Sequence, residues 1–313
     1  MAYGDMRVKK SPGARILMLE NIGRLLAIAA LLLGVPAPVA AARERAPRPA
    51  LWLVADDDTR IWLFGTFHLL PPGKAWTSRR IDRAVAEADE LVLELVDAGD
   101  HQAIAATMAE LGYSPGLPPL SARVPADQRD ELVGVVAESG AMPAILDRLE
   151  TWAAALSLAG VMFTRLGISG DAGVEEGLTR RLAGSGKPIR GLETAEEQFR
   201  FFDGLSEPAQ RSFLAGMLDD PRDMQGQFDA MMNAWLAGDV EGIARTFNDE
   251  QDLTPELKEV LIERRNANWA LWVERRLAAP GTAFVAVGAG HLAGPGSLQE
   301  KLGARGLRVR RVQ

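Results

Sequence analysis

The chain has 313 residues, of which 47% are hydrophobic and 25% charged, which excludes a largely disordered protein and allows one sizeable core. Its formal net charge of −7 excludes the broad basic surface that nucleic-acid binding requires, so we expect a peptide or small-molecule substrate. It contains no Cys, which excludes disulfides and a lipidated N-terminal Cys.

Residues 1–42 have the three parts of a secretory signal peptide. Basic residues precede an apolar run of 11 residues, Leu25 to Val35, and a small-residue stretch follows, with cleavage expected near Ala40 to Ala42. A membrane-spanning helix needs roughly 20 apolar residues, so we expect no permanent membrane span after cleavage. Met18 would open a signal of more usual length and is a candidate for the true start. We therefore expect a periplasmic or secreted protein.

A linker at residues 43–50, rich in Ala, Arg and Pro, leads to a domain expected at residues 51–313. Strands at 51–55 and 60–64 flank the segment Asp56-Asp57-Asp58-Thr59, whose polar turn chemistry predicts a hairpin. A helix at about 78–90 and an apolar strand at 91–96 follow. The apolar composition of that strand suits a sheet covered on both faces.

From about residue 99 to 167 the pattern changes to helical spacing, which predicts a helical subdomain inserted in the sheet. A helix at about 174–183 and a strand at 188–192 come next. Thr194 and Glu197 form a capping box that starts another helix, and more helices fill 208–248. Thr254 as N-cap, with a Pro after it, opens a long helix to about Leu277.

The chain closes with an apolar strand at 283–287, a loop at 288–296, a helix at 297–304 and a strand at 307–312. Strands from both ends of the chain are thus expected in one sheet. The predicted fold class is α/β, with a central mixed sheet built from N- and C-terminal strands and a large helical insertion.

Two of the three His residues share one setting. His68 in Gly65-Thr66-Phe67-His68 and His291 in Gly288-Ala289-Gly290-His291 each follow, by three positions, a Gly at the end of an apolar strand. We expect the Gly to let the backbone turn sharply, so that the imidazole lies over the carboxyl edge of the sheet, where α/β sheets bind ligands. If the strands are neighbours, both rings face one cleft. Alternatively, each His only bonds loop carbonyls.

A catalytic divalent ion usually takes a third protein ligand and keeps one position open for water. Glu94 interrupts an apolar strand, where a carboxylate is costly unless a cation or several donors compensate it; alternatively it reaches solvent or pairs with an Arg. Glu193 ends a strand before a helix and is a candidate ligand or general base, or only a helix-terminus charge. We predict metal ligands among His68, His291, Glu193 and Glu94.

Arg265 lies on one helical stripe with Trp269 and Trp272, so its guanidinium is expected to be shielded and to need an anionic partner. It is a candidate to orient an anionic substrate group, or alternatively part of a structural ion pair. Asp171 and Glu175 have a weaker claim to a role because charges at helix starts are common. We assign no role to the third His, at position 101.

These residues resemble the TraB/GumN family, which includes the animal TIKI proteases. The resemblance covers about residues 50–313 and rests on four segments: Trp62-Leu63-Phe64-Gly65-Thr66-Phe67-His68-Leu69-Leu70-Pro71, Gly191-Leu192-Glu193-Thr194 with Glu197-Gln198, Arg265-Asn266, and Val287-Gly288-Ala289-Gly290-His291-Leu292. It implies a domain related to the erythromycin-esterase and ChaN-like group. It also implies an active site with His68, His291 and a Glu, for which Glu94 and Glu193 are candidates, and in TIKI proteins divalent-cation-dependent peptide cleavage. Glu175 departs from the family pattern, in which an Asp follows Gly-Val.

Three functional hypotheses follow. The first is a divalent-metal-dependent hydrolase of peptide or amide bonds, in which Mn, Co or Zn held by His68, His291 and a Glu activates water and a second carboxylate moves the proton. The second is a non-catalytic periplasmic protein that binds a metal or small ligand in the same cleft. The third is a metal-free esterase that uses a His as base. The sequence contains no Gly-x-Ser-x-Gly, His-Glu-x-x-His or Walker motif that would favour other chemistry.

Overall fold

The computed structural model describes residues 46–96, 101–165, 173–218, 221–247 and 254–313. The expected signal peptide at 1–42, its alternative start Met18, and Asp171 lie outside these residues. Within the described ranges, no helix has both the length and the apolar character that crossing a membrane requires.

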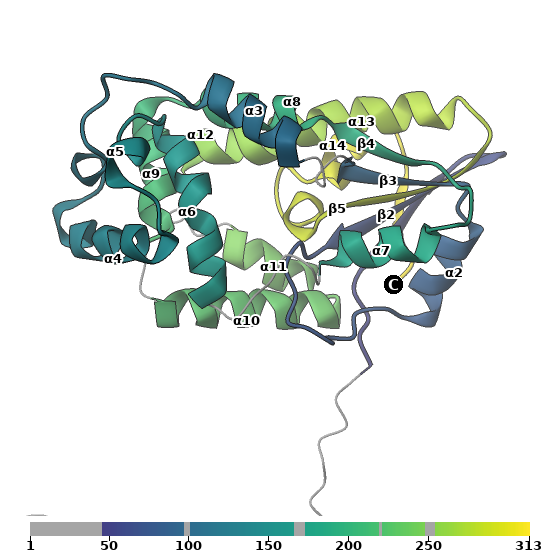
Figure 1. The fold of residues 1–313 in the computed structure, drawn as a ribbon. Coiled ribbons are helices and arrows are strands. Elements are labelled where there is room, and N and C mark those ends of the chain that lie inside the picture. Colours follow the sequence, from purple (N-terminus) through teal and green to yellow (C-terminus); the bar gives the residue numbers. More distant parts are fainter. Residues whose placement is uncertain (1–45, 97–100, 166–172, 219–220, 248–253) are drawn as a thin grey trace, which may run out of the picture. The chain divides into compact units, whose positions relative to one another are not determined.

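A mixed sheet with the strand order β4-β3-β5-β2-β1-β6 forms the centre of the domain (Figure 1). Its strands are β1 (Leu51–Ala55), β2 (Thr59–Thr66), β3 (Glu90–Leu95), β4 (Ile189–Glu193), β5 (Gly281–Gly288) and β6 (Val309–Arg311). Strands β4, β3, β5 and β2 are parallel to one another, whereas β1 pairs antiparallel with β2 and with β6. The first two strands and the last two therefore meet in one mixed sheet, which confirms the predicted α/β class.

The hairpin of β1 and β2 forms as predicted. Leu51 pairs with Phe64 and Ala55 pairs with Arg60 in antiparallel register. The turn is held by Asp56, whose side-chain oxygen accepts hydrogen bonds from the backbone N–H of Thr59 at 2.8 Å and of Asp58 at 3.2 Å. This is the local Asp-to-backbone bonding that favours such residues in turns.

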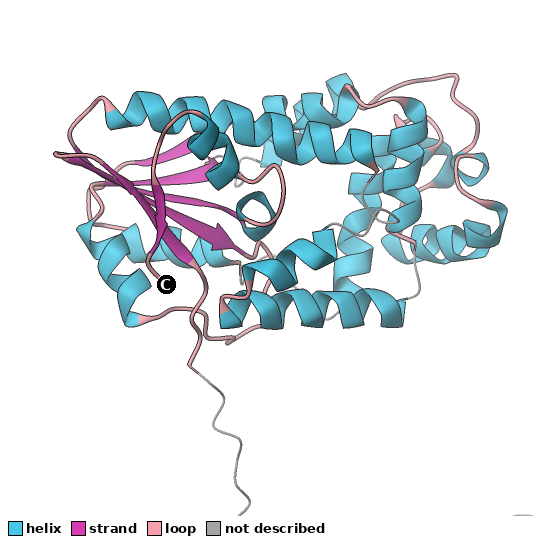
Figure 2. Ribbon diagram, turned by 180° about the vertical axis from the view of Figure 1, so that it is seen from behind, coloured by secondary structure: helices cyan, strands magenta, loops and turns pink. Residues whose placement is uncertain are grey.

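Helices cover both faces of the sheet, as Figures 1 and 2 show. On one face lie α13 (Arg264–Leu277) and α14 (Leu298–Ala304), and on the other lie α2 (Arg79–Glu87), α7 (Val174–Leu182), α10 (Pro221–Ala237) and α11 (Val240–Phe247). In β2, Ile61 and Leu63 are buried against the first group, whereas Phe64 is buried against the second. Alternate residues of a strand face opposite sides, so a strand covered on both sides must be apolar throughout.

The remaining helices gather beyond the carboxyl edge of the sheet (Figure 1). They include α3 (His101–Leu111), η1 (Leu120–Ala122), η2 (Ala126–Gln128), α4 (Arg129–Ser139), α5 (Pro143–Leu146), α6 (Thr151–Arg165), α8 (Ala195–Asp203) and α9 (Glu207–Gly216). Helices α4, α5, α6 and α9 share an apolar core that includes Leu132, Leu146 and Leu214. Buried Arg123 joins the connecting segments by donating to the carbonyls of Leu149 and Asp147, at 2.6 Å each.

The predicted capping box is confirmed. The side chain of Thr194 accepts from the backbone N–H of Glu197 at 3.2 Å, and the Glu197 carboxylate accepts from the backbone N–H of Thr194 at 2.7 Å. These two bonds satisfy backbone donors that the first turn of α8 would otherwise leave unpaired. Helix α8 therefore starts immediately after β4, with Glu193 at the junction.

The predicted long helix after Thr254 is confirmed, because Thr254 is its N-cap and helical structure continues to Leu277, but the helix is not α-helical throughout. A π-helical turn, η4 (Glu259–Glu263), separates α12 (Pro255–Lys258) from α13. Before and within this turn, Leu257 and Val260 pack with α9, whereas Trp269 packs on the sheet. The wider turn redirects the apolar stripe from one partner to the other.

Candidate functional site

The candidate residues of the site lie at the ends of four adjacent parallel strands. In sheet order, Glu193 ends β4, Glu94 is near the end of β3, His291 is in the turn η5 (Ala289–Leu292) after β5, and His68 follows β2. Strands β2 and β5 are direct neighbours, which is the condition for the two imidazoles to face one cleft, and Thr66 pairs with Gly288. Parallel strands bring their carboxyl ends to one edge, so the sheet gathers residues that lie far apart in the chain.

The expected reason for the two Gly residues is wrong. Gly288 has φ −50° and ψ 137°, a conformation that any residue can adopt, so it makes no special turn. Instead, a Cβ atom on Gly288 would lie 3.1 Å from His68 Nε2 and 3.2 Å from Glu94 Oε1. A Cβ atom on Gly65 would lie 3.1 Å from Ala289 Cα. Each Gly thus makes room for the other motif, and the two motifs interlock by close approach.

Glu94 is at the centre of the site, with its side chain only 11% exposed. Its Oε1 accepts the backbone N–H of Gly288 at 2.6 Å and lies 3.8 Å from His291 Nε2, and its Oε2 accepts from Arg265 at 2.8 Å. Burial alone would raise the pKa of this carboxyl. The neighbouring imidazoles, Arg265 and the Gly288 N–H outweigh burial and lower the pKa to about 2. Glu94 is therefore a buried carboxylate at neutral pH, compensated by cations and donors as expected.

Arg265 joins the two buried carboxylates, and the expected shielding of its guanidinium is confirmed, because the side chain is 12% exposed. Its Nη2 donates to Glu94 and Glu193, and its Nε donates to Glu193. Its Nη1 lies 3.3 Å from Leu261 O and 3.2 Å from His291 Nε2. A guanidinium has five N–H donors, and these contacts engage all of them. The contacts support the structural ion pair rather than the orientation of an anionic substrate group.

Glu193 is held by three side chains and is only 6% exposed. In addition to Arg265, the indole of Trp269 donates to Glu193 Oε1 at 2.9 Å and the amide of Gln198 donates to Glu193 Oε2 at 3.1 Å. These bonds tie the end of β4 to α8 and α13. Of the two candidate carboxylates, Glu94 is the one that lies beside the imidazoles.

His68 faces the open side of the site, with 59% of its side chain exposed. Its Nδ1 lies 2.7 Å from Glu175 Oε1, and Thr66 donates to the same oxygen. Helix α7 is placed for this contact because the backbone N–H of Val174 donates to Phe67 O at 3.0 Å. Loss of hydration would lower the pKa of His68, but the hydrogen bond and charge of Glu175 outweigh it and raise the pKa to about 9. Most of the ring is exposed, so the pairing with Glu175 dominates the pKa of His68.

Glu175 is therefore part of the site, although its sequence setting at a helix start gave it only a weak claim. Replacing Glu175 by Gln is expected to lower the pKa of His68 from about 9 toward its ordinary value of 6.5, because the anionic partner is lost. A folded-state pKa raised in this way stabilises the fold below about pH 6.5, and that stabilisation is lost as the pH rises through about 9. NMR titration of the His68 ring measures the change. Glu176→Gln, at the neighbouring exposed position, is the control, and an unchanged His68 titration in Glu175→Gln would contradict the prediction.

His291, in contrast, is buried, with its side chain 6% exposed. Its ring packs on Trp269 with 4.4 Å between the ring centroids. Burial, assisted by the charge of Arg265, lowers the pKa of His291 to about 3 despite the nearby carboxylate of Glu94. The Nδ1 atom lies 2.8 Å from the side-chain oxygen of Asn266. Asn266 belongs to the Arg265-Asn266 segment of the family resemblance, but the sequence analysis assigned it no role.

The donors present fit a divalent ion in type. His291 Nε2 lies 3.8 Å from Glu94 Oε1, and His68 Nε2 and Glu94 Oε1 both face the space beside Gly288. The Nδ1 atom of each ring is engaged by a protein oxygen, an arrangement typical of metal-binding imidazoles. Arg265 contacts His291 Nε2, and among the described residues no three His, Asp or Glu side chains are grouped as around a bound ion. The guanidinium would have to withdraw from His291 before an ion is held there.

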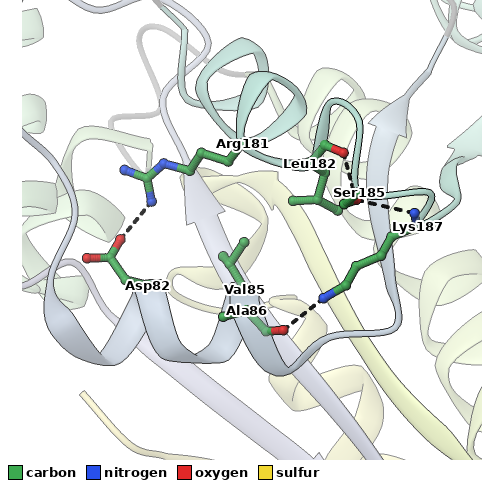
Figure 3. A pocket seen from close by; sticks show the side chains of 7 residues that line it. All are labelled: Asp82, Val85, Ala86, Arg181, Leu182, Ser185 and Lys187. Atoms are coloured by element: carbon green, nitrogen blue, oxygen red, sulfur yellow. Dashed lines mark hydrogen bonds and ion pairs between the residues drawn. The ribbon is translucent and has the colours of Figure 1, made fainter.

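A separate pocket of about 250 Å³ lies between α2 and α7 (Figure 3). Its polar groups pair with one another, as Arg181 bonds Asp82 at 2.7 Å and Lys187 Nζ donates to Ala86 O at 2.8 Å. A Lys that donates to a carbonyl in the last turn of a helix stabilises that helix end. We therefore assign this pocket a structural role.

Comparison with known proteins identifies relatives of this chain. The model of the TraB/PrgY/gumN family matches residues 50–311. The protein YbaP of Escherichia coli (strain K12), described as uncharacterized, is 25% identical over 262 residues, which cover 81% of this chain and 92% of YbaP. The YbaP protein of Shigella flexneri matches with the same identity and coverage. No solved structure matches significantly.

Proposed function

The chain belongs to the TraB/PrgY/gumN family, and from this premise we propose that it is an exported, divalent-metal-dependent hydrolase of peptide or amide bonds. The proposed ligands are His68 Nε2, His291 Nε2 and Glu94, and Mn, Co or Zn suits such nitrogen and oxygen donors. Export to the periplasm is proposed from the signal-like pattern of residues 1–42.

The observation that carries the proposal is the crowding around Gly288. The position of a Cβ atom on this residue is within 3.2 Å of both His68 Nε2 and Glu94 Oε1, and Glu94 Oε1 is 3.8 Å from His291 Nε2. Two imidazoles from matched motifs and a buried carboxylate thus approach one another at the edge of the sheet where ligands bind. Perturbed titratable groups gathered in this way are a feature of catalytic sites.

When bound, a divalent ion supplies a Lewis acid for the scissile carbonyl and eases deprotonation of water. The chain's own residues would then position the reaction. Glu175 and Asn266 hold the two rings through Nδ1, and Arg265 balances the charge of Glu94 and Glu193. Glu175, 23% exposed at the open side of the site, is the second carboxylate that would pass a proton toward the leaving amine.

The position of Arg265 favours a second candidate, metal-free hydrolysis. The guanidinium already compensates Glu94 and Glu193 and contacts His291 Nε2, so the site is electrostatically complete without an added ion. His68, exposed and paired with Glu175, would then take a proton through Nε2 from the water that attacks the substrate carbonyl and return it to the leaving oxygen or nitrogen. This candidate acts on ester or amide bonds and predicts activity that a chelator leaves unchanged.

Metal analysis of the full chain, purified without chelators, tests the first proposal. We expect about one ion per chain in the native protein and loss of that ion in the double variant His68→Ala, His291→Ala. Substitution of the third His, His101→Ala, is the control and should retain the ion. Equal metal content in the native protein and the double variant would refute the metal site.

Peptide-library hydrolysis measured with and without chelator separates the remaining hypotheses. Chelator-sensitive turnover that is absent from the double variant supports the metal hydrolase. Turnover that survives the chelator supports the metal-free enzyme. Retention of a metal or small ligand without turnover supports the non-catalytic binding protein.

A further inference from the structure

The side chain of Asn266 is fully buried and its amide orientation is determined by its neighbours. Its Nδ2 lies 3.2 Å from His291 O and 2.9 Å from Gly296 O. Both neighbours are carbonyl oxygens, which only accept hydrogen bonds, so the NH₂ group must face them. The opposite orientation would place the amide oxygen against two other oxygens.

This orientation directs Asn266 Oδ1 toward the ring of His291. The two atoms Oδ1 and His291 Nδ1 are 2.8 Å apart. A carbonyl oxygen has no proton to donate, so the hydrogen bond forms only if Nδ1 carries the hydrogen. In a neutral imidazole with Nδ1–H, the Nε2 atom has a free lone pair.

Arg265 supplies an independent observation on the other ring nitrogen. Its Nη1 lies 3.2 Å from His291 Nε2. A guanidinium only donates hydrogen bonds, so Nε2 must be the acceptor. The contacts of the two ring nitrogens therefore require the same tautomer of His291.

We propose that Asn266 is a positioning residue that holds His291 as the Nδ1–H tautomer and leaves its Nε2 lone pair facing Arg265, beside Glu94. The two matched His motifs are then chemically different. The Nε2 atom of His291 binds either a metal ion or a donated hydrogen. His68 is exposed and paired with a carboxylate, and in the metal-free site it is the ring that delivers a proton to solvent or substrate. What His291 accepts rests on the proposed function, but its tautomer does not.

The ring of His291 is also prevented from rotating. Trp269 packs on it from α13, and the Asn266 NH₂ group fixes the loop on both sides by bonding the carbonyls of His291 and Gly296. Asn266 and Trp269 are three positions apart, on one face of the helix. One helix face thus sets the position, the orientation and the tautomer of the ring.

Nitrogen-15 NMR of His-labelled full chain, dialysed against chelator, measures the tautomer directly. We expect the His291 Nδ1 resonance at the protonated position and the Nε2 resonance at the unprotonated position. The chain has three His residues, so single substitution of the other two assigns the signals. A native His291 protonated on Nε2, alone or together with Nδ1, would overturn the proposal whatever the enzymatic activity is.

Two variants test whether Asn266 is the cause. Asn266→Leu removes the acceptor of Nδ1–H. We expect a Nε2-protonated population of His291 to appear, in which Arg265 Nη1 gives up its contact with Nε2 and Glu94 Oε1, at 3.8 Å, is the nearest acceptor. Asn266→Asp keeps an oxygen toward Nδ1 and should retain the native tautomer, although its second oxygen then faces the carbonyls of His291 and Gly296 and lowers the stability of the fold. A folded Asn266→Leu variant that keeps only the Nδ1–H form would contradict the proposal. If Asn266→Leu does not fold, Asn266→Asp and the native protein decide, since loss of the Nδ1–H form in Asn266→Asp would also contradict it.

Discussion

Replacing Arg265 by Gln is expected to destabilise the fold by about 3–5 kcal/mol, because it leaves two buried carboxylates without their cation. Glu94 and Glu193 are 11% and 6% exposed, and both bond the same guanidinium. A carboxylate that stays charged away from water loses hydration without compensation, so the free energy of unfolding falls. Urea unfolding followed by circular dichroism at neutral pH measures the loss.

Arg264→Gln is the matched control, because Arg264 is the preceding residue of the helix and is 54% exposed beside Glu259. Its effect should be within about 0.5 kcal/mol of zero. Adding Glu193→Gln to Arg265→Gln should recover part of the lost stability, since one orphaned charge is removed. Equal losses for Arg264→Gln and Arg265→Gln would show that the buried pair does not contribute.

Gly173→Ala is expected to cost about 1–3 kcal/mol and to disturb the pairing of His68 with Glu175. A Cβ atom at this position would overlap the backbone carbonyl oxygen of His68. Gly173 is the N-cap of α7 and has φ −62°, so the cost arises from this overlap and not from an unusual backbone conformation. Thermal unfolding measures the stability, and NMR titration of His68 reports whether its pKa has fallen from about 9.

Gly303→Ala provides the opposite control. Gly303 lies in α14, and a Cβ atom there would meet nothing within 4 Å. Ala is the better helix former, so this change should stabilise the protein by about 0.5–1 kcal/mol and leave His68 unchanged. A Gly173→Ala protein as stable as the native chain, with the same His68 titration, would mean that α7 can move away from β2 without cost.

Much of the candidate site follows from the sequence pattern alone. The repeated Gly-x-x-His setting after two apolar strands indicated that His68 and His291 share one edge of the sheet, and β2 and β5 are indeed paired. The odd carboxylate in the apolar strand β3 indicated Glu94, because its cost requires compensation. These inferences succeeded because the position of a residue at a strand end depends on local pattern and on the geometry common to parallel sheets.

The roles within the site do not follow from local pattern. Arg265 was a candidate for substrate binding. Its Nη2 group instead donates to Glu94, a residue 171 positions away in the chain, so that N–H is not available to a substrate. Glu175 reaches His68 across 107 positions. The Gly residues were expected to turn the backbone, yet Gly288 makes room for a side chain from another strand. Which atoms meet across such distances is decided by packing.

The sequence by itself determined the α/β class, the hairpin, the capping box and the strand-end positions of the two imidazoles, because periodicity, turn chemistry and caps act over a few neighbouring residues. The tertiary structure decided which carboxylate stands beside the imidazoles, where the helix before Arg265 widens into a π turn, and how Asn266 holds His291. Hydrogen bonds and burial between distant segments have no local signal, since they exist only after the strands and helices have packed.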